Sequence, residues 1–418
     1  MNQDQRNITL LFTTRIIRLF AYGFLSIVLA LYLAKTGLTE TQIGLLFTGT
    51  LIGDAIITLA ITTVADRIGR RKMLILGALL MILAGIVFAL TRNYLLLLLA
   101  AVIGVISPSG NEIGPFLSME QAGLTQLIPN ERRTQIFAWY NLAGSFATAV
   151  GALSGGWLTQ FLRSNGWSAL AAYQTVILGY ALAGVILILL FILLSPAVEV
   201  KTNQAAPQIV VQGRGLNLGL HQSRKIVFKL SALFALDAFA GGFVIQSLLV
   251  YWFHRRFGLD TGVLGSIFFG ANILAGISAL LAARIAARIG LIKTMVYTHI
   301  PSNILLCLVP LMPGAGLAIT MLLLRFSISQ MDVPTRQSYT MAVVSPDERS
   351  AASGVTAIAR SIGASASPAL AGLLLATTWL LNAPLLIAGG LKIIYDLILY
   401  RSFQTIKPPE EHKTEPSS

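Results

Sequence analysis

Charged side chains interrupt long apolar stretches of this sequence, and these residues are the best suited to chemistry. The acids can bind a proton or pair with a base, and the bases can hold an anion. A charge at the centre of a membrane helix costs roughly 2.5–3.5 kcal/mol, so each one is a functional candidate. The candidates are Arg15, Arg18, Asp54, Glu112, Asp237, Arg325, Asp332, Arg336, Arg360, Lys392 and Asp396.

Two of the acids lie next to helix-breaking residues. Glu112 falls in a stretch with prolines at 108 and 115, and Asp332 comes two residues before Pro334. Proline removes a backbone donor and disrupts the preceding turn, which leaves carbonyl groups available to a substrate or ion. We therefore expect Glu112 and Asp332 to bind a proton. Glu120 follows on the same stretch and is expected to lie near the cytoplasmic end of its helix, where it can serve a gate.

Some of the basic candidates could bind a substrate instead of pairing with an acid. Arg18, Arg325 and Arg336 would suit the counter-charges of an organic anion. Lys392 and Asp396 are spaced four residues apart on one helix and are expected to form a structural pair.

The elements that must position these residues are membrane-spanning helices. Of the 418 residues, 55% are hydrophobic and 11% are charged, whereas soluble domains carry about a quarter charged residues. Apolar runs recur at the length of about 20 residues that a membrane helix needs. The twelve predicted helices lie near residues 8–34, 41–64, 73–91, 95–119, 135–162, 172–194, 226–252, 261–285, 292–312, 316–340, 352–377 and 381–401.

The distribution of basic residues predicts how these helices are oriented. With a cytoplasmic N-terminus, 19 of the 30 Lys and Arg residues fall in cytoplasmic loops and ends, five in outward loops and six within helices. This positive-inside bias places both termini in the cytoplasm, and it accounts for the net charge of +13 without nucleic-acid binding. We expect a multi-pass protein of the cell inner membrane.

The chain also contains an internal repeat. The segment 128–133 is echoed by 344–349, and the segment 64–69 by 285–290. Both echoes have a similar offset, which indicates two related halves of six helices. The expected organisation is an N-terminal bundle (1–194), a polar cytoplasmic linker (195–224), a C-terminal bundle (225–406) and a disordered tail (407–418).

The strongest local motif lies between the second and third predicted helices. There, Asp66-Arg67-Ile68-Gly69-Arg70-Arg71 resembles the loop signature of the major facilitator superfamily, with Thr62 in place of its leading glycine. Asp66 can pair with an arginine or cap a helix, Gly69 permits a tight turn, and the basic residues hold the loop at an anionic membrane surface. We expect this loop to act as a gate; the alternative is a purely topological role for its charges.

The resemblance implies an all-α membrane fold of twelve helices in two pseudo-symmetric bundles, with helices 1, 4, 7 and 10 around a central cavity. In that arrangement Arg18 and Asp237 occupy equivalent positions, and we expect them to form an ion pair. Glycine-rich stretches at 151–156 and 363–372 resemble those of drug–proton antiporters. They suit an interface between rocking halves or ordinary close packing.

Several function classes find no support in the sequence. The only cysteine is Cys307, the four histidines lack metal-ligand spacing, and no phosphate-binding loop is present. We therefore expect a monomeric transporter without cofactor or metal, not an enzyme. The favoured function is proton-coupled efflux of a small organic molecule. The alternatives are proton-coupled uptake of a nutrient or organic anion and, more remotely, a receptor or enzyme without flux.

Overall fold

The computed structural model describes residues 3–112, 114–129, 132–199 and 220–406, without the side chains of Asp66, Thr134 and Ser350. The expected tail and most of the expected linker lie outside these ranges. Contacts divide the chain into two compact units. Unit 1 comprises Met1–Arg214 and Gln246–Phe269, and unit 2 comprises Gly215–Ile245 and Gly270–Ser418.

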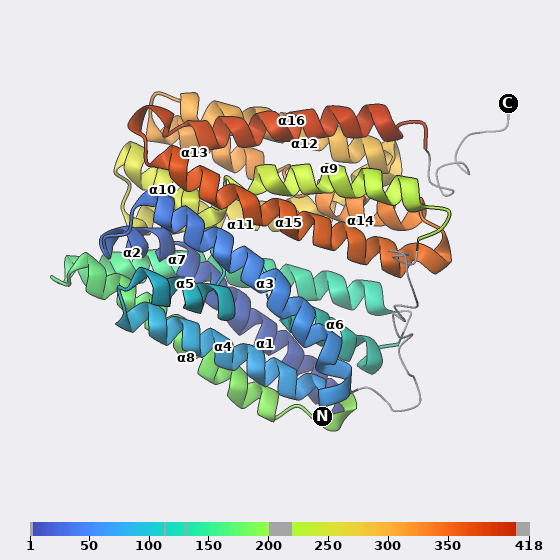
Figure 1. Cartoon of the computed structure of the whole chain (residues 1–418), viewed down its shortest axis with the longest axis horizontal. Helices are drawn as coiled ribbons and strands as arrows, with labels where there is room; N and C mark the ends of the chain where they lie inside the picture. The colour runs from blue at the N-terminus through green and yellow to red at the C-terminus, as the bar shows by residue number, and fades with distance from the viewer. Residues whose placement is uncertain (1–2, 113, 130–131, 200–219, 407–418) are drawn as a thin grey trace. The chain divides into compact units, whose positions relative to one another are not determined.

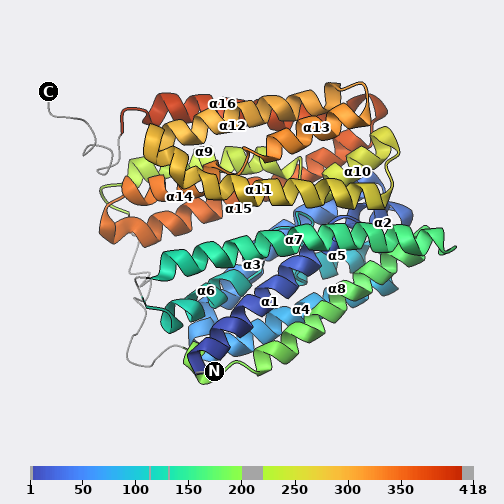
Figure 2. The same ribbon diagram turned by 180° about the vertical axis from the view of Figure 1, so that it is seen from behind.

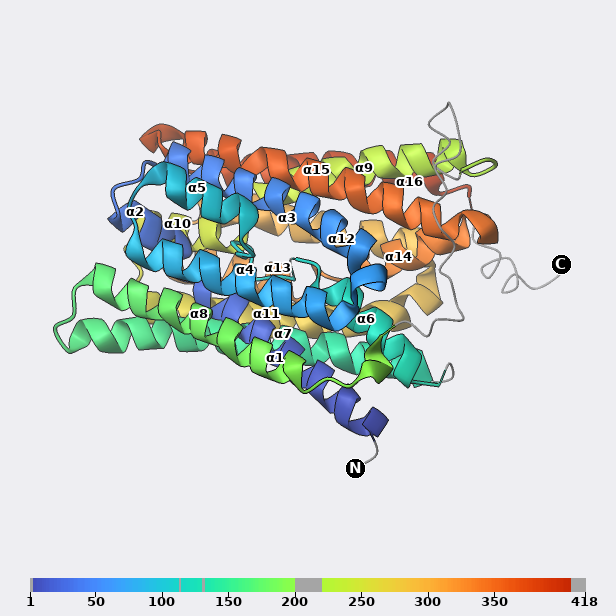
Figure 3. The same ribbon diagram turned by 60° about the horizontal axis from the view of Figure 1, so that its bottom comes forward.

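Unit 1 is built from helices that pack in pairs. α1 lies along α7, as Figure 2 shows, and α4 lies along α8, as Figure 3 shows. Its helices are α1 (Gln3–Ser26), α2 (Leu29–Lys35), α3 (Glu40–Ile68), α4 (Arg70–Leu90), α5 (Tyr94–Ile103), α6 (Phe116–Leu127), α7 (Arg133–Ser164), α8 (Ala169–Ile192), α10 (Gln246–Phe257) and the first part of α11 (Thr261–Ile289).

Unit 2 repeats these pairings with the corresponding segments of the second half. α9 lies along α15 and α12 lies along α16, as Figure 1 shows. The internal repeat inferred from short sequence echoes is therefore also present in the packing. The helices are α9 (Arg224–Gly242), α12 (Leu291–Leu308), α13 (Ala315–Phe326), α14 (Asp332–Ala342), α15 (Arg349–Leu375) and α16 (Ala383–Phe403), with the rest of α11.

Ten spans in the described residues are long and apolar enough to cross a membrane, and two shorter apolar helices are Tyr94–Ile103 and Ala315–Phe326. Four of the twelve expected helices, near 8–34, 95–119, 226–252 and 316–340, are each divided into two. The longest break runs from Gly104 to Pro115. In this break Gly110 (φ +70°) and Gly114 (φ +79°) adopt a left-handed conformation that ends regular helix geometry.

The glycine-rich stretches pack helices together inside each unit. A Cβ at Gly151 of α7 would lie 2.0 Å from the carbonyl oxygen of Phe20 in α1. At Gly363 of α15, it would lie 2.2 Å from that of Ala235 in α9. Glycine permits this close backbone approach. Of the two interpretations of these stretches, the structure favours close packing at Gly151 and Gly363.

Candidate functional site

The interior of unit 1 contains a network of two arginines and two glutamates. Arg18 donates from Nη1 and Nη2 to the two carboxylate oxygens of Glu120, both at 2.7 Å, and from Nε to Glu112 at 2.9 Å. Arg15 donates to the other Glu112 oxygen at 2.8 Å. Arg18 and Glu120 are both 0% exposed. Such bidentate pairing satisfies planar guanidinium and carboxylate groups in one geometry.

Neighbouring side chains fix Glu120 in this network. The Tyr140 hydroxyl donates to Glu120, and the Thr14 hydroxyl donates to it at 3.0 Å. The single long helix expected to carry Glu120 is broken, whereas its place near the cytoplasmic end and its role in a gate stay predictions. The break at 104–115 starts a new helix at Phe116, so Glu120 lies near the beginning of α6 and faces the buried interior.

Asp54 of α3 has different surroundings. Its Oδ1 accepts the backbone N–H of Gly114 at 2.5 Å and the Thr58 hydroxyl at 3.3 Å. No salt bridge of Asp54 occurs among the described residues, in contrast to Glu112 and Glu120. The carboxylate therefore connects α3 directly to the broken segment that carries Glu112.

Unit 2 has a second network, centred on Asp237 of α9. Its carboxylate lies 2.5 Å from Lys392 Nζ, 3.1 Å from Arg336 Nη1 and 3.4 Å from Arg360 Nη1. Arg336 also contacts Asp332 at 2.9 Å. The sequence expectations named Asp237, Asp332 and Arg336 as pathway residues, and the structure brings these three together.

Helices α12 and α16 add a polar cluster next to this network. His299 Nδ1 lies 2.9 Å from Asp396, and the Asn303 amide donates to the other Asp396 oxygen at 3.1 Å. The expected Lys392–Asp396 pair is not the main contact of either residue, because Lys392 turns to Asp237. His299 and Asn303 were missed by the sequence analysis, although their spacing of four residues places both on one face of α12.

The expected ion pair between Arg18 and Asp237 is replaced by these two networks. Arg18 is bound by Glu112 and Glu120 within unit 1, and Asp237 is bound by bases within unit 2. Each unit thus neutralises its own buried charge.

Arg325, at the end of α13, differs from the other buried arginines. It is 8% exposed, and its side chain has no hydrogen bond or salt bridge to the residues that the structure describes. The guanidinium carbon lies 5.0 Å from the centre of the Phe326 ring. Ser329, four residues further on, is 5% exposed, and its hydroxyl likewise has no partner in the described part of the chain.

The paired helices, the broken spans and the buried charge networks are consistent with what a comparison of the sequence with known families found. The family model described as Major Facilitator Superfamily matches residues 11–368. The chain belongs to the Major Facilitator Superfamily. Helices 1, 4, 7 and 10, which the resemblance places around the pathway, are the four divided spans of this superfamily member.

Curated superfamily relatives differ in how much of the chain they match. "Uncharacterized membrane protein YJR124C" of Saccharomyces cerevisiae is 31% identical over 94% of this chain and 93% of its own length. The quinolone resistance protein NorA of Staphylococcus aureus is 27% identical over 33% of this chain and 34% of its own length. The chain thus spans about a third of the NorA sequence.

Solved structures confirm the superfamily fold. The xylose transporter XylE from E. coli has a TM-score of 0.70 at 15% identity and covers 97% of this chain and 98% of its own. The nucleoside transporter NupG has a TM-score of 0.73 at 15% identity, with 97% and 100% covered. At these identities the similarity shows the fold alone.

The signature loop of the superfamily connects α3 to α4. Gly69 has φ +111°, and the backbone N–H groups of Arg70 and Arg71 donate to the Glu199 carboxylate at 2.6 and 3.2 Å. A carboxylate is favourable there because the first N–H groups of a helix are unsatisfied. Glu199 lies in the expected linker and was missed. The Arg67 side chain is exposed, and that of Asp66 lies outside the described residues.

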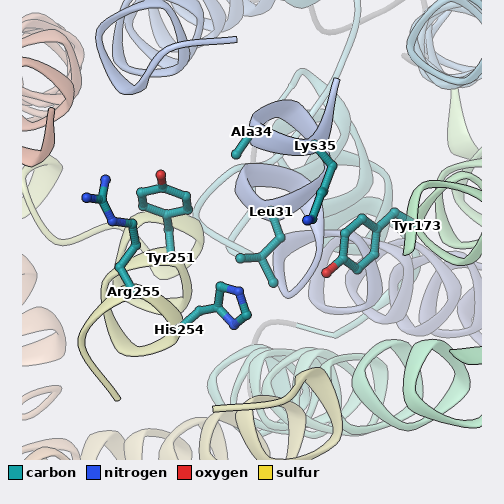
Figure 4. A pocket seen from close by; sticks show the side chains of 7 residues that line it. All are labelled: Leu31, Ala34, Lys35, Tyr173, Tyr251, His254 and Arg255. Carbon is teal, nitrogen blue, oxygen red and sulfur yellow. The ribbon is translucent and has the colours of Figure 1, made fainter. Parts of the chain in front are cut away.

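A small cavity lies between α2, α8 and α10 of unit 1, as Figure 4 shows. Its volume is about 240 Å³, enough for a few water molecules. Next to it, Glu40 accepts hydrogen bonds from the Tyr251 hydroxyl, at 2.7 Å, and from Arg255. The lining residues are Leu31, Ala34, Lys35, Tyr173, Tyr251, His254 and Arg255.

Proposed function

We propose that this chain is a proton-coupled secondary transporter that exports a small organic molecule by alternating access. Membership of the superfamily supports transport of a small molecule through the bilayer. The observation that carries the proton coupling is Asp54, an acid within a membrane span with no basic partner among the described residues.

Asp54 is better placed than Glu112 or Asp332 to carry the proton. Glu112 contacts two arginines and Asp332 contacts Arg336, so protonation of either would disrupt an ion pair. Protonation of Asp54 breaks no ion pair in the described residues and only weakens the bonds that Oδ1 accepts from Gly114 and Thr58. Glu112 and Asp332 then serve as the charged frame of the pathway.

Export is favoured over uptake by the similarity to the quinolone resistance protein over a third of the chain. Uptake of an organic anion is the second candidate, and Arg325 favours it because that buried base has no acidic partner in the described residues. The distribution of Lys and Arg supports both termini in the cytoplasm, with the protein in the cell inner membrane. The loop around Asp66, Arg67, Gly69, Arg70 and Arg71 is proposed as a gate on the cytoplasmic side.

Flux in reconstituted vesicles tests the function. Proteoliposomes loaded with a pH-sensitive dye receive a quinolone, a hexose or a dicarboxylate, and proton movement is recorded with and without the protein. We expect at least one solute to move protons only when the protein is present. Imposing a pH gradient and measuring accumulation of that solute gives the direction.

The Asp54→Asn variant should retain solute exchange and lose accumulation driven by the pH gradient. Asp260→Asn is the matched control, because Asp260 is more than half exposed and lies 4.0 Å from Arg163. Gradient-driven accumulation that is equal in Asp54→Asn, Asp260→Asn and the unmodified protein would refute the role of Asp54. Proton movement that is absent with every solute would refute coupling.

A further inference from the structure

We infer that Arg325 and Ser329 form a binding site for an anionic oxygen group of the transported molecule. The inference rests on the proposed transport function and adds the charge of the substrate. The site lies at the break between α13 and α14. Its ligand is a small organic anion that carries a carboxylate, sulfonate or phosphate.

Burial without a partner is the first observation. The Arg325 Nε and the Ser329 hydroxyl are both buried, and neither has a hydrogen-bond partner in the described part of the chain. A buried polar group without a partner costs free energy, and a buried unpaired charge costs more. A ligand oxygen between these two groups would satisfy both.

The local backbone holds the two side chains on one face. The Ser329 N–H donates to the Arg325 carbonyl at 2.9 Å, so a helical turn continues past the end of α13. Residues four apart in such a turn point the same way. The next residue, Gln330, donates its N–H to the Ser278 hydroxyl of α11 at 3.3 Å, which anchors the break to a neighbouring helix.

The charges inside unit 2 do not balance. Among the charges that the sequence analysis expects inside the membrane, unit 2 holds four bases, Arg325, Arg336, Arg360 and Lys392, and three acids, Asp237, Asp332 and Asp396. Asp237 and Asp332 act on Arg325 through space only, because Asp237 forms its salt bridges with other bases and Asp332 with Arg336. Of these four bases, Arg325 is the one without a salt bridge in the described residues.

A guanidinium and a hydroxyl together select an anionic oxygen group. Both offer hydrogen-bond donors, and the guanidinium adds a permanent positive charge. A cationic ligand would be repelled, and a neutral amide would leave the charge uncompensated. The site is therefore expected to select ligands mainly by their charge and less by their shape.

Ligand binding to the purified full-length protein in detergent tests the site directly. Benzoate, succinate and phosphate are the anionic probes, benzamide is the neutral analogue of benzoate, and benzylammonium is the cation. Binding to the folded state raises the Tm by mass action. We expect at least one anion to raise it, with no shift from benzamide or benzylammonium.

Substitutions at Arg325 and Ser329 test whether the rise in Tm comes from an anion bound at this site. Arg325→Gln should weaken anion binding roughly tenfold or more, since a hydrogen bond to a charged group is lost. Arg325→Lys should retain part of the shift, and Ser329→Ala should reduce it. Arg256→Gln, at an exposed position, should leave it unchanged. Equal shifts in Arg325→Gln and the unmodified protein, or no shift with any of the three anions, would overturn the inference.

Stability without ligand gives a second, independent readout. Replacing Arg325 removes an unpaired buried charge, so Arg325→Gln should keep or raise the Tm. Arg336→Gln should lower it, because that change leaves Asp237 and Asp332 without a shared partner. A loss in Arg325→Gln as large as that in Arg336→Gln would show that Arg325 is a structural residue. Anion binding without vesicle flux would contradict the transport proposal and leave the site intact.

Discussion

Arg18 and Glu120 show how buried charges are held in this protein. Both side chains are completely buried, and two hydrogen bonds of 2.7 Å join them. Removing both charges from a buried pair is often close to neutral, whereas removing one leaves the other uncompensated. Replacing one member of the pair should therefore destabilise the protein more than replacing both.

We expect Glu120→Gln to lower the free energy of unfolding by about 3–5 kcal/mol, because Arg18 loses a buried counter-charge. The double variant Arg18→Met with Glu120→Leu should lose less than either single change. Thermal unfolding of the purified single and double variants gives this double-mutant cycle. Additive losses would show that the two side chains are stabilised independently, contrary to the observed geometry.

At the scale of elements, each unit anchors the N-terminus of a helix with a glutamate from a distant segment. Glu199 accepts from the first N–H groups of α4 in unit 1. In unit 2, Glu348 accepts from the N–H groups of His221, Gln222 and Ser223, just before α9. Carboxylates stabilise helix N-termini through these bonds and the helix dipole.

The anchor at Glu348 predicts a dependence on pH. The hydroxyl of Ser223, with the backbone N–H groups of residues 221–223, lowers the pKa of Glu348 from 4.5 to about 2, although burial raises it. Because the pKa is lower in the folded state, the stabilisation is present above pH 4.5 and is lost as the pH falls toward 2. The protection factors of amides at the start of α9, taken against the intrinsic exchange rate at each pH, should fall over that window.

The matched control for this anchor is Glu348→Gln, which cannot ionise. Protection factors at the start of α9 should already be lower at neutral pH in this variant and should change less on acidification. If the variant and the unmodified protein respond alike to acid, another group controls the end of α9.

At the scale of the whole molecule, the second half of the seventh span contacts helices that precede it by more than 200 residues. The Ser247 hydroxyl of α10 donates to the Ser26 carbonyl of α1 at 2.8 Å, and Gln246 donates to the Ser26 hydroxyl at 2.7 Å. In alternating access one bundle rocks against the other around a fixed site. Ser26 and Ser247 both lie in unit 1, and we propose that this contact breaks when the second half of the sequence moves against the first.

Crosslinking these positions should stop transport. We expect Ser26→Cys with Ser247→Cys, in a Cys307→Ser background, to lose flux when a short thiol-reactive crosslinker is applied. Each single cysteine variant should keep its flux under the same treatment. A crosslinked protein that transports normally would mean that this contact persists throughout the cycle.

Hydropathy, charge bias and short echoes in the sequence were enough to determine the membrane class, the two-fold repeat and the positions of the buried charges. These properties follow from local composition, because the bilayer requires an apolar run of a given length wherever the chain crosses it. The expected charged residues Arg18, Glu112, Asp237, Asp332 and Arg336 all lie in the two networks. The choice of partners was decided only by the tertiary structure.

Partner choice depends on helix rotation and on breaks, and neither can be read from spacing alone. Glu120, in the short helix that begins after the break at 104–115, bonds to Arg18 of α1. On α16, Lys392 bonds to Asp237 of another helix instead of its neighbour Asp396. Glu199, in a segment that reads as a linker, caps α4 because folding brings together residues about 129 positions apart. A charge in a low-dielectric interior takes the counter-charge that packing places nearest, whatever its distance along the chain.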